Sequence, residues 1–498
     1  MLLLGIDIGT SSIKATVVDA ATQAAIASAQ YPDEENAILS PQPGWAEQSP
    51  EMWWLQVQQA ILLCNNSGKY NPADIAAIGI AYQMHGLVVV DKDQRVLRDS
   101  IIWCDSRAVE IGNKAFADIG EKKCLSRLLN SPGNFTASKL AWVKENEPEI
   151  YGHIARVMLP GDYIAMRLTG EITTSASALS EGIFYDFHKN RLSDDILKHF
   201  GFDKSLFPGI KPVFSSHGGL LKSVAEKLKL KPGTPVSYKA GDQPNNALSL
   251  NVLNPGEVAA TAGTSGVIYG VSDKLAYDPQ SRVNTFAHVN YTEKQKRLGV
   301  LLCINGTGRL YNWLKMMFGP SVSYAQMNEK AALSPSGSYG LRILPFGNGV
   351  ERMLCNKPIG AHIQNLDLNL HGKEHVLRAA HEGIACAFRY GLDIMRENGM
   401  SPSVIRAGKA NLFMSDLFTE IFVNATGVPV ELYKNDGSTG AALGAGIGAG
   451  IFKSPAEAFG RMERIKVVEP KINTFEDVYR DWKNLLEEQI NISVKQKD

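Results

Sequence analysis

The stretch GIDIGTSSIK, residues 5–14, restricts the fold of this chain most, because it places a carboxylate inside an otherwise apolar strand. Side chains alternate between the two faces of a strand, so Asp7 shares one face with Leu3 and Gly5, while residues 2, 4, 6 and 8 share the other. An unpaired buried charge costs a large part of a domain's net stability. Asp7 therefore requires a cation or a water-filled cleft, and the turn that follows it supplies backbone N–H groups and hydroxyls.

The same pattern of strand, turn and strand recurs half a chain later, in the sequence GEVAATAGTSGVIYGVSD at 256–273. Three turn positions match when the two stretches are aligned: Gly9 with Gly263, Thr10 with Thr264 and Ser11 with Ser265. A shared unit at the start of each half predicts duplicated domains, 1–250 and 251–498, which meet in the turn-rich stretch 251–256. Chance similarity between two glycine-rich hairpins is the alternative.

Elsewhere in the chain, strand and helix patterns alternate, which predicts an α/β fold with helices on the faces of the sheets. The clearest predicted elements are a helix that begins at Ser49 and Pro50, strands at 75–82 and 87–91, and a helix at 476–492.

The two hairpins are not equivalent, because Thr261 stands where Asp7 stands in the first. Both turns offer N–H and hydroxyl donors to phosphate oxygens, but only the first carries a carboxylate that can hold or orient a divalent metal. Two such loops facing each other predict a nucleotide bound between the domains.

Other phosphate-binding motifs fail on spacing. The chain contains no GxxxxGK[ST] loop, which argues against a P-loop NTPase. The stretch GAALGAGIGAG at 440–450 lacks the GxGxxG spacing, because Ala449 stands where the last glycine belongs. Its glycines at 440, 444 and 448 share one face of a helix, which allows the close approach of another backbone or of a flat ligand.

Charge and cysteine usage favour a cytoplasmic protein with a small-molecule partner. Lysine and arginine number 51, as do aspartate and glutamate, so no general field attracts nucleic acid or an anionic membrane. The six cysteines form no CxxC pair and no zinc-like spacing, which favours reduced thiols. No apolar run approaches the roughly 20 residues of a membrane helix, and leucines 2–4 are too few for a signal peptide.

The sequence PVSYKAGDQPNNALSL at 235–250 places Asp242 where a strand ends and a helix begins. An aspartate at the carboxyl end of a strand can accept a proton from a substrate hydroxyl while that oxygen attacks phosphorus. The same residue in the same place is also a common helix cap, so both interpretations remain open at this point.

Two further stretches carry polar and aromatic residues suited to a polyol. Gln83, Met84 and His85 are predicted to lie in a hairpin loop between the strands 75–82 and 87–91, although a loop histidine is more often an ordinary surface residue. In the sequence WCDSR, Trp103 provides an aromatic platform, and Arg107 with the aspartate at 105 forms either part of a sugar pocket or a structural corner.

Taken in order along the chain, these motifs resemble those of the FGGY family of carbohydrate kinases, and its xylulose-phosphorylating members most of all. The likeness spans nearly the whole chain and is carried by these stretches: GIDIGTSSIK, PGWAEQSPEMWW (43–54), YQMHG, WCDSR, LPGDYIAMRLTGE (159–171), GDQPNNA, GEVAATAGTSG, ILPFGNGVER (343–352), HEGIACAF (381–388) and GAALGAG.

The resemblance implies two ribonuclease-H-like domains of the actin ATPase type, with a cleft between them, that transfer the γ-phosphoryl group of ATP to a sugar hydroxyl with Mg²⁺. It implies Asp242 as general base and Asp7 as the carboxylate linked to magnesium. The sugar would be D-xylulose, held in the N-terminal domain by Gln83, Met84, His85, Trp103, Arg107, Asp242 and Gln243. The nucleotide would contact Gly9, Thr10, Ser11, Ser12, Lys14, Gly263, Thr264, Ser265, Gly408, Lys409 and Asn411. A homodimer is expected by analogy.

Departures from the family pattern leave rival interpretations open. The turn at 408–411 lacks the family's usual glycine run, which bears on nucleotide choice. Ser175 and Gln243 replace a usual aspartate and asparagine, so a kinase for another substrate of the ribulose, fuculose, gluconate or glycerol type is the close rival. After Glu351 and Arg352, the usual Thr-Pro is Met-Leu, which we expect to affect local shape more than chemistry. A non-catalytic sugar or nucleotide sensor, and an actin-like filament or chaperone, are more distant alternatives.

Overall fold

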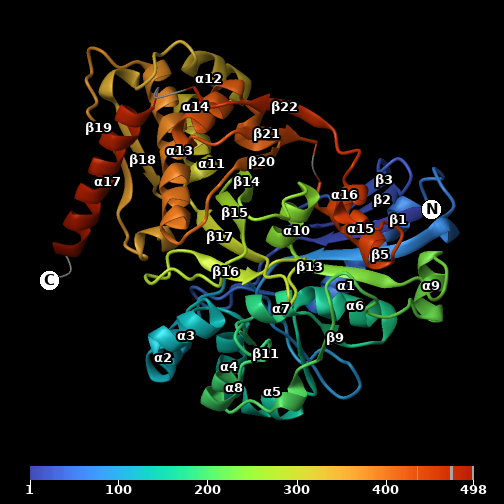
Figure 1. The fold of residues 1–498 in the computed structure, drawn as a ribbon. Coiled ribbons are helices and arrows are strands. Elements are labelled where there is room, and N and C mark those ends of the chain that lie inside the picture. The colour runs from blue at the N-terminus through green and yellow to red at the C-terminus, as the bar shows by residue number, and fades with distance from the viewer. Residues whose placement is uncertain (435, 472–474, 496–498) are drawn as a thin grey trace.

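The computed structural model describes residues 1–434, 436–471 and 475–495, and it is built around two mixed sheets with helices on their faces (Figure 1). In the first sheet, three strands form an antiparallel meander and two more add in parallel beside β1. The strand order is β13-β5-β1-β2-β3. These strands are β1 (Leu2–Ile8), β2 (Ile13–Asp19), β3 (Ala25–Tyr31), β5 (Ile75–Tyr82) and β13 (Val236–Gly241).

The second sheet repeats this arrangement strand for strand and adds one strand at each edge. Its order is β16-β17-β15-β14-β20-β21-β22, in which the five inner strands have the same parallel and antiparallel pairings as the first sheet. The strands are β14 (Glu257–Ala262), β15 (Gly266–Ser272), β16 (Asn284–Ala287), β17 (Leu298–Ile304), β20 (Val404–Gly408), β21 (Val430–Tyr433) and β22 (Arg464–Val468). The predicted recurrence of the opening hairpin is therefore confirmed, as β1–β2 and β14–β15.

The alternation predicted for β1 is present in the packing. Its even-numbered residues belong to a core beneath the helices α1 (Pro50–Asn65), α6 (Pro160–Thr169) and α9 (Lys222–Leu228), where Trp53 and Val57 pack. Leu3, on the other face, packs with Ala441 and Ala442 of α15 (Gly437–Gly448). Asp7 thus points toward the α15 side of the sheet, as the period of two predicted.

Helix α15 lies on the first sheet at backbone-to-backbone distance, although it belongs to the second half of the sequence (Figure 1). A Cβ added to Gly5 would overlap the Ser438 carbonyl oxygen, and one added to Gly79 would overlap that of Ala441. From the helix side, a Cβ on Gly448 would overlap the carbonyl oxygen of Ser237. The glycine stripe of this helix therefore serves close packing within the protein, with Gly448 against a backbone carbonyl and Gly440 and Gly444 against side chains of α10 and β13.

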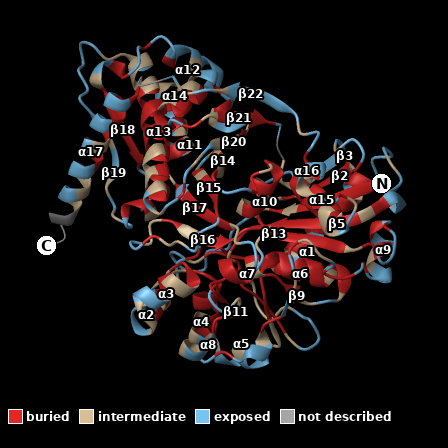
Figure 2. Cartoon of the chain, in the orientation of Figure 1, coloured by how far each residue is buried: buried red, intermediate tan, exposed pale blue. Residues whose placement is uncertain are grey.

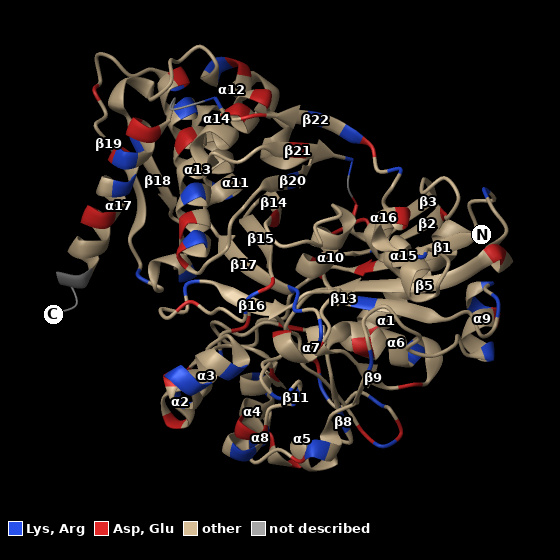
Figure 3. Cartoon of the chain, in the orientation of Figure 1, with Lys and Arg blue, Asp and Glu red and all other residues tan. Residues whose placement is uncertain are grey.

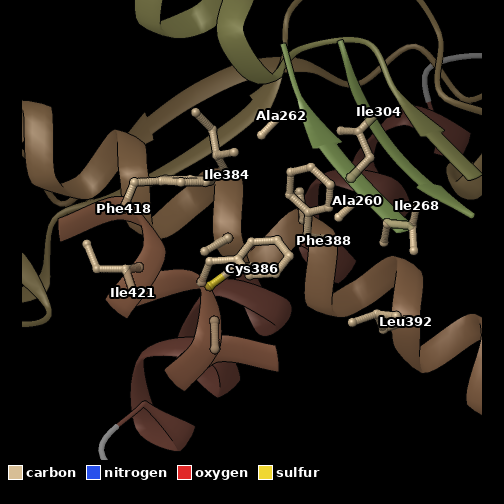
Figure 4. Close-up of a cluster of buried hydrophobic side chains, with 14 of the residues drawn as sticks. Ala260, Ala262, Ile268, Ile304, Ile384, Cys386, Phe388, Leu392, Phe418 and Ile421 are labelled. Carbon is tan, nitrogen blue, oxygen red and sulfur yellow. The ribbon is translucent and has the colours of Figure 1, made fainter. Parts of the chain in front are cut away.

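The second half has a core of its own, between the second sheet and the long helix α13 (Lys373–Glu397). Figure 4 shows Ile384, Phe388 and Leu392 of α13 facing apolar side chains of β14, β15 and β17, with Phe418 of α14 (Asp416–Thr426) beside them. Buried residues fill the strands and central helices of both halves, while the outer loops and one side of α17 (Glu476–Lys495) are exposed (Figure 2). The helices predicted at 50 and 476 are confirmed.

A helical insertion lies between β5 and β13 of the first sheet along the chain, and several short strand pairs accompany it. Its helices are α2 (Val109–Ile119), α3 (Glu121–Leu128), α4 (Thr136–Asn146), α5 (Pro148–His153), α7 (Ala176–Glu181) and α8 (Asp194–Phe200). The short strands are β4 (Glu47–Gln48), β6 (Val88–Val90), β7 (Ser100–Ile101), β8 (Arg156–Met158), β9 (Thr173–Thr174), β10 (Tyr185–Asp186), β11 (Arg191–Leu192) and β12 (Gly209–Ile210). The remaining elements are α10 (Asp242–Ser249), α11 (Thr307–Phe318), α12 (Tyr324–Ala331), α16 (Pro455–Ala458), β18 (Arg342–Phe346) and β19 (Gly360–Gln364).

The predicted hairpin around residues 83–86 is wrong. Strand β5 is flanked on both edges by parallel neighbours, β1 and β13, so it has no free edge for the strand that follows it. That strand, β6, pairs instead with β8 of the insertion. Residues 83–86 therefore connect two different sheets, at the end of β5 where parallel strands also end.

Basic and acidic residues are interspersed along neighbouring elements of the chain, in keeping with its balanced charge (Figure 3). Within the part of the chain that the structure describes, no helix has both the length and the apolar character that crossing a membrane requires.

The close approach of α15 predicts a sharp cost for a single methyl group. We expect Gly79→Ala to lower the free energy of unfolding by about 2 to 3 kcal/mol, because the added methyl overlaps the Ala441 carbonyl and the helix must shift. Gly152→Ala in α5 is the matched control, because no atom lies within 4 Å of its added Cβ. Urea unfolding measures both, and equal stability of the two variants would contradict the packing described.

Candidate functional site

Asp7 lies at the junction of the two halves, directly against the first residue of α15. A Cβ on Gly437 would meet its carboxylate, and the side chain keeps partial exposure to solvent. Burial raises the pKa of Asp7 to about 7, with further raising by the charges of Asp242 and Asp436 and an opposing effect from Lys14. Three carboxylates therefore gather here, from the end of β1, the start of α10 and the start of α15.

Asp242 and Asp436 occupy equivalent places in the two repeated units. Asp242 follows the last parallel strand of the first sheet and begins α10. Asp436 lies between the corresponding strand of the second sheet and α15, where its Oδ1 accepts hydrogen bonds from Ser438 N at 3.0 Å and Thr439 N at 3.2 Å. Asp436 was not among the predicted site residues, but carrying the alignment of the repeats past the hairpins would have found it.

Asp242 is not the cap of its helix. The cap position belongs to Gly241, and the Asp242 carboxyl is partly exposed at the junction. Burial raises its pKa to about 6, and hydrogen bonds from the backbone and side chain of Gln243 counteract part of that rise. Asp242 is therefore largely ionised at neutral pH and close enough to neutrality to accept a proton.

The donor set around Asp7 fits a magnesium ion. Magnesium is usually held by one or two carboxylates together with phosphate oxygens of the substrate, and Asp7 with a neighbouring carboxylate would supply the protein share. The charge of Lys14, which is paired with Asp436, acts on Asp7 and lowers its pKa. The described residues contain no group of three or more side chains that would hold an ion without a substrate.

Gln83 and Trp103 join the first phosphate loop to the insertion. The Thr10 hydroxyl donates to Gln83 Oε1 at 3.1 Å and accepts from Trp103 Nε1 at 3.0 Å, while Gln83 Nε2 donates to Gln48 at 3.0 Å. Trp103 is 53% exposed and leaves a ring face for a ligand. Gln83 is 2% exposed with both ends of its amide bonded, so the structure makes it a link within the protein instead of the predicted sugar contact.

His85 is held in an uncommon backbone conformation by buried polar groups. Its φ is 64°, in the left-handed region, and its carbonyl oxygen accepts from the buried Lys139 Nζ at 2.9 Å. Its Nδ1 lies 2.9 Å from the carbonyl oxygen of Glu181, which can only accept, so Nδ1 carries the proton. Burial lowers the pKa of His85 to about 3. The ring is thus neutral, and Nε2 is the acceptor that remains.

Glu181 is a site residue that the sequence did not reveal. It is 1% exposed, and its Oε2 has no hydrogen-bond partner among the described residues. That oxygen would lie 2.6 Å from a Cβ placed on Gly241, the residue before Asp242. Burial and the charges of Asp242 and Asp162 raise the pKa of Glu181 well above its ordinary value. A glutamate at the end of a short helix of small residues gave no signal, because its depth depends on long-range packing.

Arg107 forms a structural corner instead of the predicted sugar contact. Its side chain is 1% exposed, and Asp105 and Glu47 accept its hydrogen bonds or pair with it at 2.7 Å. The guanidinium stacks 3.8 Å from the ring centroid of Trp45. Nε and Nη2 thus donate to Asp105, Nη1 forms an ion pair with Glu47, and Trp45 covers one face, which favours the structural corner for the WCDSR stretch.

On the second sheet, Asn411 lies beside the second phosphate loop. Its Nδ2 would be 3.4 Å from a Cβ on Gly263, and its φ is 52°. The loop is also braced by α11, whose Gly308 N donates to the Gly263 carbonyl at 3.0 Å. Lys409 is directed elsewhere, because its Nζ pairs with Asp416 of α14 at 2.9 Å. Of the nucleotide residues predicted on this sheet, Gly263 and Asn411 thus lie together, whereas the Lys409 side chain is paired with Asp416.

Comparison with known proteins agrees with this architecture. A model of the N-terminal domain of the FGGY family of carbohydrate kinases matches residues 2–249, and a model of the C-terminal domain matches residues 258–451. The chain therefore belongs to the FGGY family of carbohydrate kinases, and the predicted family and fold class are confirmed.

Individual relatives are similar over almost the whole chain. Xylulose kinase of Bacillus subtilis (strain 168) is 30% identical, covering 91% of this chain and 90% of its own. Xylulose kinase of Escherichia coli (strain K12) is 29% identical, covering 92% and 91%. The crystal structure of xylulose kinase from Rhodospirillum rubrum has a TM-score of 0.88 at 26% identity, covering 99% of this chain and 100% of that one.

The raised pKa of Asp7 predicts a pH-dependent effect of Asp7→Asn on stability. The folded state binds the Asp7 proton more tightly than the unfolded state, so the parent loses stability as pH rises from about 4 to about 7. The variant lacks this loss and should be more stable by about 2 kcal/mol at pH 8, because solvent screening reduces the roughly 4 kcal/mol of the full shift. Urea unfolding without divalent metal measures the difference. An equal difference at pH 4.5 and pH 8 would contradict the account.

Proposed function

We propose that this chain transfers the γ-phosphoryl group of ATP to D-xylulose and releases D-xylulose 5-phosphate and ADP. The observation that carries the proposal is Asp242, a partly exposed carboxylate beside Asp7 at the junction of the two sheets, with a pKa of about 6. Membership of the FGGY family supports the reaction type, and the relatives named xylulose kinase support the sugar.

In this proposal the first half binds the sugar. Met84 and His85 would contact its carbon skeleton and a hydroxyl group, with His85 Nε2 accepting a hydrogen bond. The exposed ring face of Trp103 would cover the sugar, because aromatic faces pack well against C–H groups. Gln243, next to the base, offers a second amide to a hydroxyl. Gln83 and Arg107 would act indirectly, by holding the phosphate loop and the Trp103 corner in place.

The second half would supply the nucleotide to the same junction. The turn at 9–12 and the turn at 263–265 would hold the phosphate chain with N–H groups and hydroxyls, assisted by Lys14 and by Asn411 beside Gly263. Magnesium held at Asp7 would offset the charge of these phosphates. Phosphoryl transfer has a loose transition state, so position and charge contribute more than base strength, and Asp242 can take the hydroxyl proton late.

A sugar panel tests the substrate directly. Purified protein with ATP and Mg²⁺ is assayed for ADP release with D-xylulose, D-ribulose, L-fuculose, glycerol and D-gluconate, and without any sugar. We expect D-xylulose to give the highest kcat/KM. ADP release with D-xylulose equal to the sugar-free rate, together with clear release for another compound, would transfer the proposal to that substrate.

Asp242→Ala should lower kcat by about 10²-fold or more while ATP binding stays within a few-fold, because the carboxylate acts on the proton and not on the nucleotide. In the parent, kcat/KM should fall tenfold per pH unit below about pH 6, where Asp242 becomes protonated. Asp194→Asn in α8 is the control, since this residue lies on the exposed surface of the insertion. Unchanged turnover in Asp242→Ala would remove this residue from the mechanism.

A further inference from the structure

Arg352 has a partly buried guanidinium with no acidic partner among the described residues. In the described part of the chain, no carboxylate lies within 4.0 Å of it, and its one hydrogen bond is a long one, from Nη1 to the Ser281 carbonyl oxygen at 3.4 Å. Burial lowers its pKa. A partly desolvated cation without a counter-ion is better stabilised when an anion binds beside it, so the Arg352 guanidinium is open to an anionic ligand.

Several other enclosed arginines in this protein pair with a carboxylate, although Arg156 and Arg297 have only backbone carbonyl partners among the described residues. Arg107 pairs with Asp105, Arg282 with Asp278, and Arg406 with Glu431, each at 2.7 to 2.9 Å. Arg378 likewise pairs with Glu382 at 3.0 Å. The lack of a partner at Arg352 is therefore not the general condition of buried arginines in this fold.

The position of Arg352 is fixed by its neighbour. Glu351 is buried, and its two carboxylate oxygens accept from Asn305 N at 2.8 and 3.1 Å. This carboxylate thus ties the start of the Arg352–Leu354 3-10 helix to the loop between β17 and α11. The guanidinium is consequently held at the inner edge of the second half, although Glu351 is fully used by backbone donors.

From this edge, Arg352 faces the sugar-side residues of the first half. Its guanidinium lies 6.0 Å from the ring centroid of Phe135, and that centroid lies 4.8 Å from the ring centroid of His85 in a T-shaped arrangement. The charge of Arg352 contributes to the lowered pKa of His85. Burial and the charge of Asp242 raise the pKa of the Cys303 thiol, and the charge of Arg352 opposes that rise. Arg352 and Asp242 therefore approach one region from opposite halves of the molecule.

We propose that Arg352 binds the phosphoryl group while it passes from ATP to the sugar, and then holds the phosphate of the product. This inference rests on the proposed kinase function and names the residue that would neutralise the transferred group. A guanidinium offers two parallel N–H donors that match two phosphate oxygens, and such a pair is stronger than a neutral hydrogen bond. Charge on the equatorial oxygens in the transition state would be stabilised in the same way.

The chemical balance of the step leaves Arg352 unchanged. The sugar oxygen forms a bond to the γ-phosphorus as the bond from that phosphorus to the bridging oxygen of ADP breaks. The hydroxyl proton passes to the Asp242 carboxylate and from there to solvent. Arg352 keeps all its protons and contributes only hydrogen bonds and charge.

The test compares Arg352→Ala and Arg352→Lys with the parent. For the alanine variant, we expect kcat to fall by about 10²- to 10³-fold, as for loss of one transition-state donor, with KM for D-xylulose within about threefold. Its Kd for D-xylulose 5-phosphate, measured by calorimetry, should rise by about 30-fold or more, the size of a lost charge-assisted pair. The kcat and the product Kd of Arg352→Lys should lie between those of the parent and those of Arg352→Ala, because lysine keeps the charge without the paired donors.

Chemical rescue separates this role from a structural one. Guanidinium chloride at tens of millimolar should raise the kcat of Arg352→Ala about tenfold or more and leave Asp242→Ala unchanged. Product affinity equal to that of the parent, or turnover that guanidinium does not restore in folded Arg352→Ala and that Arg352→Lys does not recover in part, would overturn the proposal. If the parent proves to phosphorylate another sugar, the same comparison is made with that sugar and its phosphate, so the two proposals fail separately.

Discussion

The backbone contact between α15 and the first sheet is the constraint on which the rest of this structure depends. Glycines at 5, 79 and 448 remove the side chains that would otherwise hold the helix away. Because the helix follows β21 of the second sheet, this contact joins the two halves of the chain. It also sets the start of the helix, with Asp436, against Asp7 and Lys14. A carboxylate inside a strand is therefore tolerated at Asp7, because the packing that buries it also provides a nearby cation and an opening to solvent.

The two sheets are built alike around this contact. Each sheet ends in a parallel strand that leads to an aspartate and a helix, first Asp242 with α10 and then Asp436 with α15. These two helices pack against each other, so the starts of both helices lie at the junction of the two halves. The two aspartates differ in their charge partners and in their pKa values. Among the described residues, Asp242 forms no ion pair and has a raised pKa, whereas Asp436 is paired with Lys14 and its pKa is lowered. The repeated backbone thus places Asp242 where its carboxylate can accept a proton, and it places Asp436 in an ion pair within the protein.

Local patterns in the sequence predicted what depends on local physics. The alternation around Asp7, the repeated hairpin, the strand before Asp242 and the family motifs needed only nearby residues, and each is present in the structure. What the sequence did not predict depends on distant partners. The connection at 83–86 resembled a hairpin because strand pairing across the insertion is not visible locally. Glu181 gave no signal, and Arg352 stood out only as part of the family motif at 343–352, because the depth of one and the missing partner of the other arise from packing. Gln83 and Arg107 had suitable side chains for a sugar, but their hydrogen bonds are used within the protein.

The central claim is that carboxylates from different strands serve one reaction, Asp7 through the metal and Asp242 through the acceptor hydroxyl. A crystal structure with D-xylulose, Mg²⁺ and a nonhydrolysable ATP analogue tests it most directly. The account predicts an Asp242 carboxylate oxygen at about 3 Å from the hydroxyl that faces the γ-phosphate, with Asp7 bound to the ion directly or through a water molecule. A sugar whose reactive hydroxyl lies beyond the reach of Asp242, or an ion bound away from Asp7, would contradict it.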